Sequence, residues 1–359
     1  MPRIDSFLEM VVEQGASDLH FHAGNVPIIR HDGDLIALPF RVLSEIEAKR
    51  FVLEIMSPEQ RDVFEKKQEL DFVYMMEGVG RFRANAFVQS QGIGAVFRVI
   101  PPKIPRLAEL NLPRAVKKIS QLGNGLVLVT GPTGSGKTTT LAAIVNEINA
   151  TSQRHIITIE DPIEFIHPTI ESVVTQRQIG EHAESFAQAL RSALRESPDV
   201  LVVGEMRDVE TVSLALSAAE TGVLVFGTLH SNSAAKAIDR ILDVLPEESR
   251  EQMRGVLSVL LRGVIAQQLC KHVSGAGRVA VLEILQQTFA VSNMIRENKL
   301  FQLDGYLQTA SNDGPDMQSL DQALFQAVRS GIVAAEEAMK FASSPEVLRR
   351  LIAELPDDV

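Results

Sequence analysis

One short stretch, Gly125 to Thr140, limits what this chain can fold into more than any other part of the sequence. It reads GLVLVTGPTGSGKTTT, an apolar run that leads through a glycine-rich turn into residues typical of a helix. Its second half satisfies the spacing G-x-x-x-x-G-K-[ST], and a strand before the turn with a helix after it is the context in which this spacing binds phosphates. The sequence therefore predicts an α/β fold with a nucleotide-binding loop.

The chemistry of this loop explains its composition. Glycine allows backbone angles that a Cβ forbids, so that successive N–H groups can point inward at phosphate oxygens. A helix that begins near Lys137 adds its positive N-terminal end, and the Lys137 ammonium suits the β- and γ-phosphates. The Thr138 hydroxyl is a ligand for Mg²⁺. The predicted contacts with ATP come from Gly131, Pro132, Thr133, Gly134, Ser135, Gly136, Lys137, Thr138 and Thr139.

Composition excludes several classes of protein. A chain of 359 residues, 45% of them hydrophobic and 23% charged, is long enough for two soluble domains. The formal net charge of −11 argues against a protein that coats nucleic acid, so no nucleic-acid partner is expected. A single cysteine, Cys270, excludes a disulfide framework and a four-cysteine zinc site. The acidic start is unlike a signal peptide, and no apolar run approaches the roughly 18 residues of a membrane span, so we expect a cytoplasmic protein.

The first part of the chain, residues 1–100, is predicted to be a small mixed α/β domain. Its alternating pattern at Ser17 to Arg30 indicates one strand, and later segments alternate between helical and strand spacing. The run Pro101-Pro102-Lys103-Ile104-Pro105 is the clearest boundary, because prolines fix φ and keep their predecessors extended. We expect residues 101–123 to form a linker and a connecting helix.

Residues 124–359 are predicted to be a second domain in which strands and helices alternate. The apolar runs at His155 to Glu160, Asp199 to Val203 and Val223 to Thr228 are continuous, as the buried strands of a parallel sheet require. From Ala234 onward the sequence predicts mainly helices.

Two acidic segments follow predicted strands. Glu160, Asp161 and Glu164 lie in and beyond the end of one strand, at the edge of an open α/β sheet where ligands bind. A carboxylate beside a loaded phosphate loop can orient or deprotonate the attacking water; the alternative is a solvent-exposed acidic loop. Glu205 ends the strand of PDVLVVGE, where a carboxylate can hold Mg²⁺.

The other candidates are cationic. Arg195 lies four residues after Arg191 on a predicted helix, and Arg207 follows Glu205 by two. The alternative for these arginines is simple pairing with Glu181, Glu184 or Asp208. His230 ends the strand of FGTLHS and could sense a γ-phosphate by hydrogen bonding, although a lone histidine is more often a core or surface residue.

Three arginines of the first domain form a further candidate group. Arg81 and Arg83 lie two apart, so on a strand they share a face, and Arg98 lies on the next predicted strand. They form either a solvated strand face or a set of cations that reach a neighbouring subunit's nucleotide, as arginine fingers do.

These segments together resemble the secretion ATPases that power type IV pili and type II secretion, and specifically the pilus retraction (PilT) family. The matching strings are QGASDLH (14–20), GPTGSGKTTTLAA (131–143), TIEDPIEF (158–165), ALRSALRESPDVLVVGEMRD (189–208) and ETGVLVFGTLHSNSAAKAIDR (220–240). The resemblance extends from about residue 1 to about residue 300. It implies a PAS-like α+β N-terminal domain followed by a RecA-like ATPase domain, with six subunits in a ring.

The resemblance also implies roles for single residues. Glu164 would polarise the attacking water, with Glu160 and Asp161 in the same motif. Glu205 would hold magnesium, and His230 would sense the phosphate. Arg195 and Arg207 would act from the ATPase domain, and Arg83 and Arg98, together with Arg81, would reach the next subunit. An inner-membrane platform protein would be the partner that keeps the motor peripheral to the membrane, and a second retraction ATPase is a further candidate partner.

The sequence departs from the family at two places. The family's AIRNLIRE segment, which matters for retraction and not for hydrolysis, is AVSNMIRE at 290–297, and HTNTA in the histidine motif is HSNSA. Two other functions therefore stay open beside pilus retraction. One is a related ring ATPase of secretion or conjugation, and the other is an ATP-binding regulatory paralogue of a pilus motor.

Overall fold

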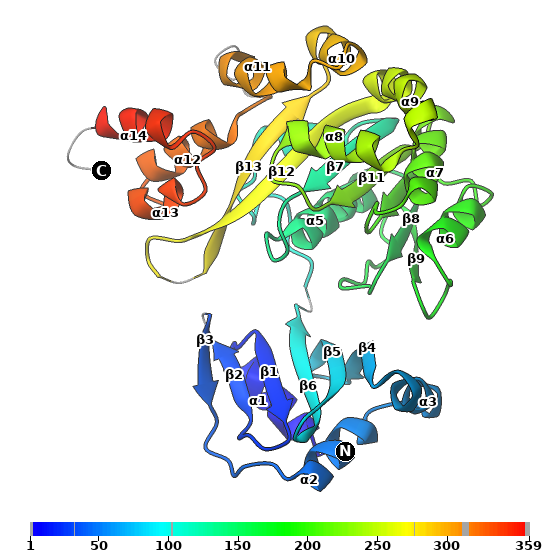
Figure 1. The fold of residues 1–359 in the computed structure, drawn as a ribbon, viewed down its shortest axis with the longest axis vertical. Coiled ribbons are helices and arrows are strands. Elements are labelled where there is room, and N and C mark those ends of the chain that lie inside the picture. Colours follow the sequence, from blue (N-terminus) through cyan, green and yellow to red (C-terminus); the bar gives the residue numbers. More distant parts are fainter. Residues whose placement is uncertain (1–2, 32, 102, 276, 311–315, 356–359) are drawn as a thin grey trace. The chain divides into compact units, whose positions relative to one another are not determined.

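The computed structural model describes residues 3–31, 33–101, 103–275, 277–310 and 316–355. The chain divides into two compact units, Met1–Lys103 and Ile104–Val359, drawn in Figure 1. Of the proline-rich run at this division, Pro102 lies outside the described residues. Most of the segment predicted as a linker, 101–123, belongs to the second unit, because the helix α4 (Arg114–Ser120) contributes Val116 and Ile119 to that unit's core.

In its described residues the first unit is an antiparallel sheet of six strands in the order β3-β2-β1-β6-β5-β4 with three helices. Its elements are α1 (Asp5–Glu13), β1 (Asp18–His22), β2 (Ile28–His31), β3 (Asp34–Ala37), α2 (Glu45–Glu54), α3 (Pro58–Lys67), β4 (Glu69–Met76), β5 (Gly80–Gln89) and β6 (Gly92–Ile100).

The prediction of one strand over 17–30 is wrong, because β1 and β2 are two strands that pair antiparallel with Leu19 opposite Ile29. The alternating pattern continues through both strands, and it therefore hides the turn between them.

Alternation along these strands separates a core from a polar face. Leu19 and Phe21 of β1 are fully buried among aromatic and aliphatic side chains of β5, β6 and the helices. The intervening residues Asp18, His20 and His22 therefore lie on the opposite face of the sheet.

The second unit is built on a seven-stranded sheet in the order β13-β12-β7-β11-β10-β8-β9. All neighbours in it run parallel except β12 and β13. The strands are β7 (Gly125–Thr130), β8 (His155–Glu160), β9 (Val173–Gln178), β10 (Val200–Val203), β11 (Leu224–Leu229), β12 (Leu261–Lys271) and β13 (Arg278–Gln286). The helices after α4 are α5 (Lys137–Thr151), α6 (Phe186–Ala193), α7 (Val209–Glu220), α8 (Ala234–Val244), α9 (Glu247–Leu260), α10 (Phe289–Arg296), η1 (Leu300–Gln302), α11 (Leu303–Ala310), α12 (Leu320–Arg329), α13 (Ala335–Met339) and α14 (Pro345–Ala353).

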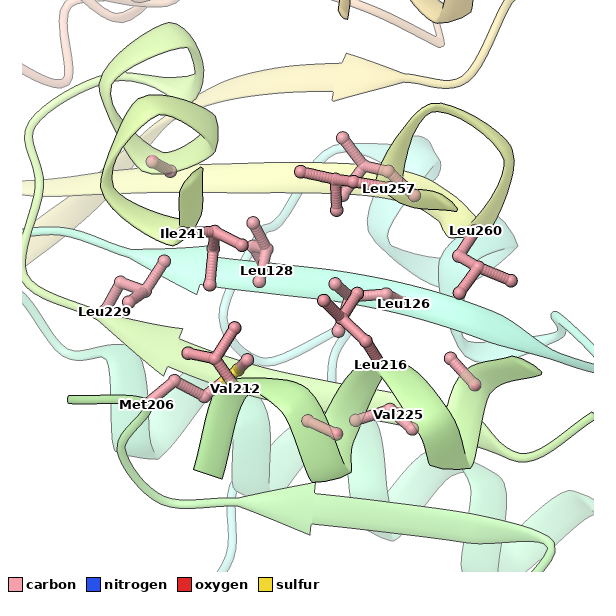
Figure 2. Packing of buried hydrophobic residues seen from close by; sticks show 14 of the residues in the cluster. Leu126, Leu128, Met206, Val212, Leu216, Val225, Leu229, Ile241, Leu257 and Leu260 are labelled. Carbon is pink, nitrogen blue, oxygen red and sulfur yellow. The ribbon is translucent and has the colours of Figure 1, made fainter. Parts of the chain in front are cut away.

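Both faces of this sheet are covered, and β7 contributes to each. Leu126 and Leu128 pack with Leu216 of α7, Ile241 of α8 and Leu257 of α9, as Figure 2 shows. The alternate residues of β7 pack with α4 and α5 on the other face. A strand that is buried on both faces must be apolar at every position, which explains why β7 has no polar alternation.

The expectation of a mainly helical region from Ala234 onward is wrong for residues 261–286. Two long strands, β12 and β13, lie there in an antiparallel hairpin (yellow in Figure 1). β12 begins directly where α9 ends, so no loop separates the helix from the strand. Within β12 the apolar run is only Val264, Ile265 and Ala266, and periodicity cannot distinguish so short a run from part of a buried helix.

In the part of the chain that the structure describes, no helix is both long enough and apolar enough to cross a membrane.

Candidate active site

The phosphate loop lies between the end of β7 and the start of α5, at the carboxyl edge of the parallel strands. Gly131, Gly134 and Gly136 have φ angles of 149°, 81° and 83°, in the region that favours glycine. Gly136 is the N-cap of α5 and has no side chain with which to cap it, so the first-turn amides receive no side-chain cap. Uncapped amides at the positive end of a helix form a site for an anion.

Lys137 lies at the centre of the site. Its Nζ donates hydrogen bonds to the carbonyl oxygens of Gly131 (2.8 Å) and Pro132 (2.9 Å). Burial lowers the pKa of this ammonium, and the negative charges of Glu205 and Glu164 oppose that effect. Both predicted carboxylates therefore lie close enough to Lys137 to stabilise its charge.

Glu205, Arg207 and His230 are brought together. Glu205 follows β10 and His230 follows β11, and these strands are parallel neighbours. The Oε1 atom of Glu205 lies 3.3 Å from Nε2 of His230 and also pairs with the Arg207 guanidinium. The hydrogen bond to Glu205 raises the pKa of Arg207.

The acidic loop after β8 completes one wall of a pocket. Glu160 ends β8, the peptide bond between Asp161 and Pro162 is cis, and Glu164 follows in the loop. All three carboxylates line the same pocket as Lys137 and Thr138. The structure thus gathers the predicted acidic residues beside the phosphate loop.

Two glutamines of the edge strand β9 hold this loop, and neither is among the predicted site residues. Gln176 Nε2 donates to Glu160 Oε1 (3.1 Å) and to the Phe165 carbonyl (2.9 Å), while its Oε1 accepts from the His167 N–H (2.8 Å). Gln178 Oε1 accepts from the Ile163 N–H (3.0 Å). Their spacing of two residues on a strand was the available signal, because it places both amides on one side.

His167, also missed, forms part of the pocket wall. It is buried, and its Nδ1 has no hydrogen-bond partner among the described protein atoms. Burial lowers the pKa of its imidazole to about 4, so the ring is neutral at physiological pH.

Arg191 and Arg195 do not join this site within the chain. Arg191 pairs with Glu210, whereas the predicted alternative partner, Asp208, caps α7 by accepting from the Thr211 N–H (2.8 Å). Arg195 follows α6 beside Glu196, whose carbonyl lies 3.0 Å from Nδ1 of His155 at the start of β8. It therefore lies toward the amino-terminal edge of the sheet, opposite the phosphate loop.

The arginines of the first unit lie in a row across its sheet. The register pairs Arg83 of β5 with Arg98 of β6, Arg98 with Asp18 of β1, and Asp18 with Arg30 of β2. Asp18 is 3% exposed and accepts from Arg98 Nε at 2.8 Å, while the Arg98 side chain stays 63% exposed. Arg81, two residues before Arg83, lies on the same face.

Comparison with known proteins identifies the family to which this chain belongs. The model of the type II/IV secretion system protein family matches residues 1–340. The type IV pilus retraction ATPase PilT of Pseudomonas aeruginosa is 49% identical over 343 residues, which cover 96% of this chain and 99% of that protein. The chain belongs to the PilT family of type II/IV secretion ATPases.

Other members of the PilT family agree along nearly the whole chain. The type IV pilus ATPase PilU of Pseudomonas aeruginosa is 39% identical, covering 97% of this chain and 91% of PilU. A crystal structure of the pilus retraction motor PilT with bound ADP has a TM-score of 0.87 at 44% identity, covering 96% of this chain and 98% of that one.

The loop of this PilT-family chain fits a nucleotide with magnesium. A Cβ at Gly134 would meet nothing within 4 Å, so the loop is open there, with the Lys137 ammonium and the α5 amides beside it. Among the described residues no three His, Cys, Asp or Glu side chains could hold a metal together.

Proposed function

We propose that the chain is an ATPase motor that couples hydrolysis of ATP to retraction of type IV pili. The observation that carries this proposal is the convergence of the phosphate loop, Glu164 and Glu205 on Lys137. Similarity to PilT proteins along nearly the whole chain supports the retraction role.

Binding of ATP is assigned to the phosphate loop. The loop amides and the Lys137 ammonium would bind the β- and γ-phosphates, and phosphate oxygens would replace the carbonyl contacts that Lys137 makes with Gly131 and Pro132. Thr138 and Glu205 would hold Mg²⁺, which when bound neutralises charge on the phosphates.

Hydrolysis is assigned to the acidic loop. Glu164 orients the attacking water and accepts its proton, with Glu160 and Asp161 in the same pocket wall. His230 contacts Glu205 at 3.3 Å, so a change at Glu205 when the γ-phosphate leaves reaches the end of β11 directly. Arg207 keeps the charge of Glu205 paired.

The working assembly is a homo-hexamer in which arginines of one subunit complete the nucleotide site of the next. Arg98 and Arg83, with Arg81 on the same face, suit this role because they form a cationic row on a sheet. Arg195 lies away from the phosphate loop of its own chain, so any role in hydrolysis would be at the nucleotide site of the next subunit. The ring would work in the cytoplasm against an inner-membrane platform protein, with a second retraction ATPase as a further partner and no nucleic acid.

Purified full-length protein tests the enzymatic part. Lys137→Ala should abolish ATP binding and turnover, and Glu164→Gln should retain binding while turnover falls at least a hundredfold. Glu171→Gln is the matched control, because it removes the same charge from an exposed position after the same loop. Normal phosphate release by Glu164→Gln would contradict the role assigned to Glu164, and no turnover by the wild type would favour a regulatory paralogue.

A deletion strain tests the retraction part. Wild type should restore twitching and normal pilus length, whereas Glu164→Gln should leave long, static pili. If the purified protein has full ATPase activity but the deletion strain has normal pili, the protein serves another secretion system and the retraction role is refuted.

A further inference from the structure

Gln267 of β12 is a buried polar side chain beside the phosphate loop that no motif accounts for. β12 runs parallel to β7 with Ala266 opposite Thr130, so Gln267 lies one step past the point where β7 gives way to the loop. Gln267 as a whole is 2% exposed, and both the oxygen and the nitrogen of its side-chain amide form hydrogen bonds. Nε2 donates to the Ser135 carbonyl and Oε1 accepts from the Thr140 hydroxyl, each at 2.7 Å.

The loop packs closely against Gln267 at two of its glycines. A Cβ at Gly131 would lie 2.4 Å from the Gln267 carbonyl oxygen, and one at Gly136 would lie 2.9 Å from its Nε2. The main chain of Gln267 thus contacts the beginning of the loop and its side chain contacts the end. One residue of β12 therefore sets the spacing between the two ends of the loop.

The hydrogen bond to Ser135 also fixes the direction of a peptide group. In a trans peptide the C=O and the following N–H point to opposite sides. Because the Ser135 carbonyl points to Gln267, the N–H of Gly136 points away from β12. At the same time the bond to Thr140, in the first turn of α5, holds the helix whose N-terminal amides would face an anion in the phosphate loop.

We propose that Gln267 is a positioning residue for the nucleotide, which holds the Ser135–Gly136 peptide and the first turn of α5 in the orientation that binds phosphate. This inference rests on the proposed nucleotide site. It requires one donor and one acceptor on the same side chain, so neither leucine nor glutamate can replace the glutamine.

The test is the affinity of the full-length protein for Mg-ADP, measured by titration calorimetry together with the melting temperature. Gln267→Leu should weaken ADP binding about tenfold or more, since tenfold corresponds to about 1.4 kcal/mol and to the net value of one or two hydrogen bonds. Gln268→Leu is the matched control, because its side chain leaves the same strand on the opposite face and is partly exposed. It should change the affinity less than twofold.

The Thr140 pair tests the same contact if Gln267→Leu fails to fold. Thr140→Val removes the hydroxyl at constant shape and should weaken ADP binding about fivefold, while Thr140→Ser keeps the hydroxyl and should restore affinity to within twofold of wild type. Equal affinities of the two variants would overturn the proposal.

Melting temperature separates positioning from mere stability. If Gln267→Leu lowers the melting temperature but leaves the ADP affinity unchanged, Gln267 is structural only and the proposal fails. Lys137→Ala is the reference for the site itself. Loss of ADP binding in Lys137→Ala without loss in Gln267→Leu refutes only this inference, whereas unchanged binding in Lys137→Ala refutes the proposed function.

Discussion

Glu283 offers a prediction whose magnitude follows from its surroundings. This residue of β13 is 4% exposed, and its Oε1 accepts from the N–H of Ala234, the first residue of α8, at 2.6 Å. Burial raises the pKa of its carboxyl group to about 7. Hydrogen bonds from the Ala234 and Leu320 amides oppose the rise, and the charges of Asp304 and Asp321 add to it.

The direction of the pH dependence follows from linkage. A folded-state pKa raised from 4.5 to about 7 means that the folded chain keeps a proton that the unfolded chain has lost. The stabilisation is therefore complete below pH 4.5 and is lost as the pH rises through 7. At about 1.4 kcal/mol per pKa unit, the free energy of unfolding should fall by about 3 kcal/mol over this window.

Glu283→Gln isolates this contribution, because glutamine resembles the protonated acid and cannot ionise. The unfolding free energy of the variant minus that of the wild type should rise by about 3 kcal/mol from pH 4.5 to pH 8, whatever constant offset the amide introduces. Glu248→Gln, at an exposed position of α9, is the control and should show no such trend.

Urea unfolding between pH 4.5 and pH 8 measures the effect. The chain has no tryptophan and two tyrosines, of which Tyr306 alone lies in the second unit. In a Tyr74→Phe background the tyrosine fluorescence therefore reports on the unit that contains Glu283. A difference between variant and wild type that stays constant across this range would refute the reasoning.

Two further predictions concern the loops and the arginine row. Gln176→Leu removes three hydrogen bonds from the acidic loop but none from the phosphate loop. The kcat for ATP should therefore fall about tenfold, while the affinity for ADP stays within twofold of wild type. Equal losses of kcat and of ADP affinity would contradict separate support of the two loops. Asp18→Asn removes the negative charge that pairs with Arg98 and should destabilise the first unit by about 1 kcal/mol, a modest value because the Arg98 side chain is 63% exposed. Thermal unfolding compared with the exposed control Asp71→Asn measures this, and matching melting temperatures would contradict it.

The central strands and the phosphate loop were predictable because local chemistry dictates their residues. A phosphate cradle needs glycines with positive φ and a lysine at a fixed offset, so Gly131, Gly136 and Lys137 are visible in the sequence. Strands buried on both faces need largely apolar runs, as β10 and β11 have. Glu205 and His230 follow from their positions at the ends of such strands.

The supporting residues were not predictable, because their type is decided by partners far away in the chain. Gln267 contacts Ser135 and Thr140 across more than a hundred positions, and only the placement of β12 beside β7 reveals it. The sequence predicts mainly helix in this region, so the register of β12 could not be predicted from it. Gln176 likewise depends on the parallel pairing of β9 with β8.

The hairpin of β12 and β13 explains how distant motifs come to act at one place. Its first strand holds the phosphate loop through Gln267, and its second holds the start of α8, just after His230, through Glu283. Ala266, next to Gln267, lies directly opposite Glu283 in the register, so the two supports are adjacent. Since β13 also packs against α12, a displacement of the phosphate loop cannot leave the C-terminal helices unaffected unless the hairpin itself deforms. Substitutions in the hairpin should therefore disturb nucleotide binding and the packing of α12 together.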